Sequence, residues 1–225
     1  RLSDGQGINM GAATRYKQAF LKANPWCIFC GGSTPATSIE HCPPRALFQF
    51  RQWPVGFEFS ACNACNGGTS DDDLMLSMLA RMNPFDDSSD RDGRTAGLIQ
   101  SVVRQFPGIA SRMVLSAAEA RKENRRFGLR PLPGKLHQET GIARVPPEMR
   151  RAVHVVGAKL AKAVYHKYTG RPFPATGCLL LHFFTNIGLF DKGHFPMIEQ
   201  MRHFQGPVPD LVRTGNLLND QFSYK

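Results

Sequence analysis

Three motifs decide the fold of this chain: Cys27-Ile28-Phe29-Cys30, Glu40-His41-Cys42-Pro43-Pro44-Arg45 and Cys62-Asn63-Ala64-Cys65-Asn66. Two Cys-x-x-Cys pairs therefore bracket an acid–histidine dipeptide. Each pair can place two thiolates on a tight turn, and four thiolates satisfy the tetrahedral coordination of a structural zinc site. The sequence predicts one Zn²⁺ ion held by the two pairs, that is by Cys27, Cys30, Cys62 and Cys65.

The six cysteines also allow a second interpretation, a secreted disulfide framework. The chain is long for that class, and four of the cysteines lie in two pairs with metal-ligand spacing, so we favour zinc. Cys42 and Cys178 are left over. We expect both to be small buried hydrophobic residues.

Around these motifs the chain resembles the HNH, or His-metal finger, endonucleases, in the branch with two zinc knuckles and a Glu-His-x-Pro-Pro box. The resemblance covers Trp26 to about Met82, where the four cysteines, Glu40-His41, Pro44 and Asn66 follow the family's order. It implies a core of two strands and a helix (ββα) around a divalent ion. It also implies hydrolysis of phosphodiester bonds in DNA.

The resemblance assigns a role to three residues of the motifs. It implies that His41 is the general base, a role that suits an imidazole titrating near neutral pH. It implies that Glu40 and Asn66 bind a catalytic Mg²⁺ or Mn²⁺, since hard cations prefer carboxylate and amide oxygens. The chain departs from the family twice: Glu40 stands where many members have Asp, and 55–61 lacks the usual asparagine before the second cysteine pair.

The charge of the chain favours a polyanionic partner. Its formal net charge is +10, and residues 91–225 hold 21 Lys+Arg against 9 Asp+Glu, whereas residues 1–90 hold 7 against 9. A basic surface attracts nucleic acid by counterion release, so we expect DNA as the partner, with RNA not excluded. Candidate phosphate contacts are Arg45 and a cluster at a helix end, Arg121, Lys122, Arg125 and Arg126; a solvated surface is the alternative for each.

We expect an α+β, mostly helical fold. The resemblance implies a zinc-stabilised ββα-metal nuclease module, and periodicity predicts an appended, mainly α-helical C-terminal part containing a buried strand. The predicted units are residues 1–90, with the module core at 26–82, and residues 91–225. We expect strands at 37–41 and 57–61 and helices at 12–23, 70–82, 95–105, 109–126 and 146–168. A buried strand at 177–185, a helix near 195–203 and a strand near 222 complete the prediction.

Two segments carry more specific expectations. Asp71, Asp72 and Asp73 suit the N-terminus of the helix at 70–82, with metal binding as the alternative. On the helix at 146–168 we expect Lys159 to lie away from the buried stripe, which is formed by Met149, Val153, Val156, Leu160 and Val164.

No signal peptide or apolar run long enough to span a bilayer is visible, so we expect a cytoplasmic protein without a membrane partner. The leading hypothesis is a metal-dependent HNH endonuclease, for which a homodimer is one arrangement. The alternatives are a zinc-stabilised nucleic-acid-binding module without catalysis, suggested by the two departures, and an RNA-directed nuclease.

Overall fold

The computed structural model describes residues 11–82, 90, 92–181 and 183. Helices predominate in this part of the chain, and its strands form one two-stranded antiparallel sheet. The elements are α1 (Ala12–Ala23), β1 (Ser38–His41), η1 (Arg45–Leu47), η2 (Gln49–Arg51), β2 (Glu58–Ala61), α2 (Asn63–Gly67), α3 (Ser70–Arg81), α4 (Thr95–Gln105), α5 (Ile109–Met113), α6 (Ala117–Arg126), η4 (His137–Thr140) and α7 (Pro147–Thr169).

The sheet pairs the two halves of the motif region, residues 26–82. β1 and β2 are in register from Ser38 opposite Ala61 to His41 opposite Glu58. The first knuckle, residues 27–32, precedes β1, and a bridge between Trp26 and Pro35 closes it. Its turn needs backbone with positive φ, which Gly31 and Gly32 supply at φ 72° and 78°.

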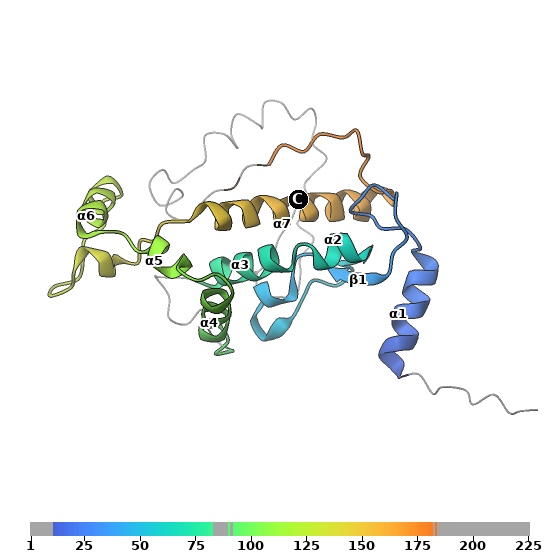
Figure 1. The fold of residues 1–225 in the computed structure, drawn as a ribbon, viewed down its shortest axis with the longest axis horizontal. Coiled ribbons are helices and arrows are strands. Elements are labelled where there is room, and N and C mark those ends of the chain that lie inside the picture. Colours follow the sequence, from blue (N-terminus) through green and yellow to red (C-terminus); the bar gives the residue numbers. More distant parts are fainter. Residues whose placement is uncertain (1–10, 83–89, 91, 182, 184–225) are drawn as a thin grey trace, which may run out of the picture.

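The long helix α7 runs alongside α3 (Figure 1). Its residues belong to two hydrophobic clusters. Its first half contributes Met149 and Ala152 to a cluster with α3, α4 and α5. Its second half contributes Ala163 to the cluster built on the first knuckle and the sheet. The contacts of α7 thus cross the predicted unit boundary at residue 90, and this helix covers the motif region.

Most predicted elements of the described part of the chain are confirmed, including both strands and the helices α1, α3, α4 and α7. The predicted helix at 109–126 is wrong as one element, because it divides into α5 and α6. Ser116 begins α6 with a capping box, in which its side chain accepts from the Glu119 N–H and Glu119 reaches back to Ser116. A local helix start therefore interrupts a continuous helical pattern.

The predicted buried strand at 177–185 is wrong over residues 177–181, which form no regular element, and Leu180 is 89% exposed. Cys178 is likewise exposed, against the prediction, whereas Cys42 is buried as expected. The rest of that strand, the predicted helix at 195–203 and the strand near 222 lie outside the described residues. None of the helices in the described ranges combines the length and apolar character that a bilayer crossing needs.

Candidate metal centre and polar site

The four motif cysteines form one cluster. The sulfur atoms of Cys27, Cys30, Cys62 and Cys65 all lie within 4.8 Å of one another. All four thiols are free of disulfides in this structure, as the zinc interpretation expects. A closed set of four sulfurs without an open position fits a structural zinc ion rather than a catalytic one.

The surroundings of Cys30 differ from those of Cys27 and Cys65. Burial raises the pKa of Cys65, as it does that of Cys27. At Cys30 burial acts in the same direction, but hydrogen bonds with the side chains of Ser33 and Thr34 outweigh it and lower the pKa to about 6. The surroundings of Cys30 therefore favour its thiolate form, and metal binding supplies the driving force to deprotonate the other ligands.

His41 lies at the end of β1, beside the loop that leads to β2. Its Nε2 is 3.1 Å from Oε1 of Glu58, the residue directly opposite it in the sheet. Tyr16 of α1 donates a hydrogen bond to the other oxygen of Glu58. The His41 side chain is 26% exposed, so that it is held by a carboxylate yet remains accessible. Burial is the main reason that the pKa of His41 is lowered, although Glu58 opposes this effect.

Arginine and tryptophan side chains flank His41. The Arg45 guanidinium lies 3.9 Å from the ring centre of Trp53, and the His41 ring meets the same tryptophan edge-on at 5.1 Å. Arg45 Nε also donates to the backbone oxygen of Arg51 at 3.3 Å. The cation predicted to meet a phosphate therefore has a fixed place beside the predicted base.

Phe50 and Arg51 form a strained turn near this group. Both have positive φ, 55° and 53°, a backbone conformation that costs free energy for residues other than glycine. The Phe50 N–H donates to Oδ2 of Asp92 at 2.7 Å, and Asp92 is paired with the buried Arg81 of α3. The turn is thus anchored to the helical part of the molecule.

Glu40 and His41 lie on opposite faces of the sheet, because successive residues of a strand alternate. Glu40 is 6% exposed and pairs with the Lys159 ammonium of α7. Lys159 is itself 6% exposed, so the prediction that it lies away from the buried stripe is wrong. Burial raises the pKa of Glu40, and the charge of Lys159 opposes that rise.

Asn66 lies on the Glu40 side of the hairpin. Its Nδ2 donates to Oγ of Ser38 at 2.8 Å, and Ser38 shares a strand face with Glu40. Within the described residues, three or more metal-ligating side chains (Cys, His, Asp or Glu) converge on one point at the four cysteines. With Glu40 already paired to an ammonium, the residues present do not fit the divalent-cation site that the resemblance implies.

The remaining predicted residues lie elsewhere. Asp71, Asp72 and Asp73 stand in the first turn of α3, as expected. The basic cluster Arg121, Lys122, Arg125 and Arg126 is exposed on α6, which Figure 1 places far from α1 and the sheet.

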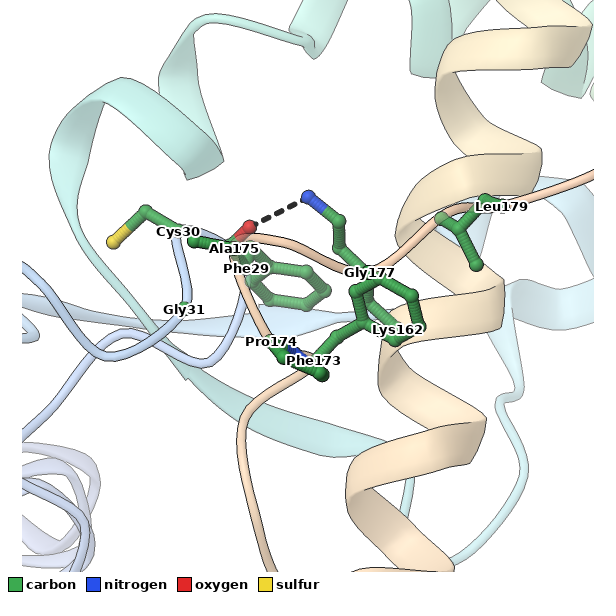
Figure 2. A pocket seen from close by; sticks show the side chains of 9 residues that line it. All are labelled: Phe29, Cys30, Gly31, Lys162, Phe173, Pro174, Ala175, Gly177 and Leu179. Atoms are coloured by element: carbon green, nitrogen blue, oxygen red, sulfur yellow. Dashed lines mark hydrogen bonds between the residues drawn. The ribbon is translucent and has the colours of Figure 1, made fainter.

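A pocket of about 400 Å³ lies beside the first knuckle, between Phe29, Cys30 and the segment after α7. Figure 2 shows Lys162 of α7 reaching from its wall to the backbone oxygen of Phe29, at 2.8 Å. Neither His41 nor Glu40 is among the described residues that line it. The pocket is therefore separate from the polar groups around the sheet.

Sequence reasoning missed three residues of the site: Glu58, Trp53 and Lys159. Glu58 could have been found from the hairpin, since pairing Ser38 with Ala61 places Glu58 opposite His41. Lys159 stands three residues after Val156 and four before Ala163, both fully buried, and this position in an apolar stripe is its signal. No comparable signal marks Trp53, which lies in an irregular loop.

Comparison of the chain with protein-family models, with curated proteins and with solved structures finds no match. What is established is a mostly helical α+β fold in which four clustered cysteines suit a structural zinc ion.

Proposed function

We propose that this protein is an endonuclease of the HNH type that hydrolyses phosphodiester bonds in DNA, with His41 as the general base. The observation that carries the proposal is the pair of His41 and Glu58 at 3.1 Å, at an accessible position beside Arg45. A base oriented by a carboxylate and adjacent to a fixed guanidinium is an arrangement suited to attack on a phosphate.

His41 is prepared for proton transfer by its contacts. Hydrogen bonding from Nε2 to Glu58 places the proton of the neutral ring on that nitrogen and leaves the lone pair on Nδ1. The lowered pKa keeps the ring neutral at neutral pH. His41 then takes a proton from water as the water oxygen bonds to phosphorus and the bond to the leaving oxygen breaks. Solvent protonates the leaving oxygen, and Glu58 stabilises the imidazolium.

Arg45 supplies positive charge to the same step. A guanidinium presents several donors in one plane and pairs with phosphate oxygens in a bidentate manner. Stacking on Trp53 and the bond from Nε to Arg51 leave the terminal nitrogens as the groups that would meet the phosphate. The exposed basic residues of α6 would add contacts to the DNA backbone farther from the reacting atoms.

The zinc centre has no part in the reaction. Its four sulfurs would hold both knuckles against the β1–β2 hairpin, and so fix the strand end that carries His41. No step is assigned to a second cation at Glu40 and Asn66, because their contacts do not fit one. The pairing of Glu40 with Lys159 favours one other function, a zinc-stabilised nucleic-acid-binding module without catalysis.

The test is cleavage of supercoiled plasmid, linear duplex DNA and RNA by the zinc-loaded protein, each with Mg²⁺, Mn²⁺ or EDTA. His41→Ala should reduce nicking by about a hundredfold or more, the scale of lost general base catalysis, with DNA affinity unchanged. Glu58→Gln keeps the shape but removes the charge that stabilises the imidazolium, and should reduce the rate less.

His154→Ala is the matched control, because His154 is an exposed histidine of α7 whose ring packs edge-on against Phe183 at 5.3 Å. Zinc content and circular dichroism establish that each variant is folded. If wild-type protein binds DNA but cleaves no substrate under any condition, the binding-module function replaces the nuclease. A His41→Ala variant as active as wild type excludes His41 as the base.

A further inference from the structure

Lys159 of α7 lies in a buried polar site on the Glu40 face of the sheet. Its Nζ pairs with Oε1 of Glu40, donates to Oγ1 of Thr69 at 2.6 Å and lies 3.5 Å from Oδ2 of Asp73. The side chains of Lys159 and Glu40 are 8% and 7% exposed. One cation is thus surrounded by three oxygen atoms, one from β1 and two from the N-terminal end of α3.

The ammonium of Lys159 balances one of the two carboxylates that it contacts, Glu40 and Asp73, so the site carries a formal charge of −1 rather than −2. Burial alone would lower the pKa of Lys159, but the carboxylates of Glu40 and Asp73 outweigh burial and raise it, so the amine stays protonated. The neighbouring Asp72 has its own partner, because Arg151 Nε lies 3.5 Å from its Oδ1. The position between the carboxylates of Glu40 and Asp73 is therefore already occupied by the ammonium of Lys159.

Lys159 is also held in place by its helix. The residues one turn before and after it, Val156 and Ala163, are buried, which fixes the helix face that Lys159 shares. The Nζ atom lies 5.8 Å from the ring centre of Phe29 in the first knuckle. A divalent ion that took the position between Glu40 and Asp73 would displace the ammonium, and a buried charge that loses its partner is costly.

We infer that Lys159 is the resident cation of the site formed by Glu40 and Asp73, and that the protein binds no divalent ion there. The ammonium provides the countercharge that the family resemblance assigns to Mg²⁺ or Mn²⁺. One consequence rests on the proposed function: cleavage at His41 would require no divalent ion bound to Glu40.

Manganese binding to the zinc-loaded protein, measured by electron paramagnetic resonance without any nucleic acid, tests this inference. Wild type and Glu40→Gln should bind Mn²⁺ equally. Lys159→Met removes the ammonium but keeps an unbranched stem, and should gain affinity about tenfold or more, because two carboxylates then face one vacant position. The double variant Lys159→Met/Glu40→Gln should lose that gain.

Lys162→Met is the matched control, because Lys162 lies one turn away on the same helix but donates to the Phe29 carbonyl. It should gain no Mn²⁺ site. A wild-type Mn²⁺ site that Glu40→Gln abolishes would overturn the inference, and so would a folded Lys159→Met variant that binds no tighter than wild type. If Lys159→Met does not fold, the comparison of wild type with Glu40→Gln still decides. Since no substrate is present, the outcome is independent of whether the protein is a nuclease.

Discussion

Loss of one zinc ligand should destabilise the motif region strongly. Cys65→Ser replaces one of the four clustered sulfurs with a poorer ligand. Structural zinc contributes about 10–16 kcal/mol of apparent binding free energy, comparable to the whole stability of a typical domain. If the substitution costs only about 3 kcal/mol of this, the Tm of a chain of this size falls by roughly 6–12 °C. Complete loss of the ion costs more, because Cys27 and Cys62 belong to the buried cluster on the sheet.

Two measurements check this prediction: zinc per chain by elemental analysis and Tm by circular dichroism. Cys178→Ser is the matched control, since Cys178 is an exposed cysteine outside the cluster, and it should change neither value. Wild-type protein without zinc, or zinc-free protein with an unchanged Tm, would refute the reasoning. Retention of one zinc per chain at the same Tm in Cys65→Ser would refute the assignment of Cys65 as a ligand.

Two further predictions concern the helical part. Burial alone would raise the pKa of Asp92, but hydrogen bonds from Arg81 outweigh burial and lower the pKa from 3.8 to about 2. The ionised carboxylate therefore contributes about 2 kcal/mol to the stability of the fold. This contribution is present above the unfolded pKa and is lost as the pH falls toward 2. Asp92→Asn should therefore lower stability in urea denaturation at pH 7, by an amount that shrinks near pH 3; a pH-independent difference would contradict this. Replacing Arg121, Lys122, Arg125 and Arg126 with Gln should weaken DNA binding and reduce its salt slope by roughly one unit for each phosphate that the variant no longer neutralises. Lys135→Gln is the control for a single surface charge, and an unchanged slope in the fourfold variant would show that the α6 cluster is only a solvated surface.

Local patterns predicted much of the fold, because they act over short distances in the chain. Two x₂-spaced cysteine pairs are sufficient to predict the sulfur cluster, since the chemistry of zinc requires the pairs to meet. The helices α3, α4 and α7 follow from apolar spacing and from Pro147 in the first turn of α7. The family's motif and the prolines after it predicted the first strand, and alternation predicted the second, each to within one residue.

The partners of Glu40 could not be predicted in the same way. Lys159 is 119 positions away from it, and no local signal specifies which face of α7 meets which face of the hairpin. A lysine in a helix is usually solvated, so the prediction of an exposed Lys159 followed the common case. The prediction that Cys178 is buried was wrong for a different reason. The apolar run from Cys178 to Leu181 has the composition of a buried strand. Such a run forms a strand only where another strand is available to pair with it.

The alternation of side chains along β1 separates the two candidate sites. Adjacent residues of a strand point to opposite faces, so the contacts of Glu40 and His41 come from different parts of the molecule. Glu40 meets α7, whereas His41 meets β2 and the loop that carries Arg45. The extra methylene of Glu40, compared with Asp, extends its carboxylate toward Lys159. The departure from the family pattern at this position is thus consistent with a carboxylate that binds an ammonium on α7 while the histidine beside it remains accessible on the other face.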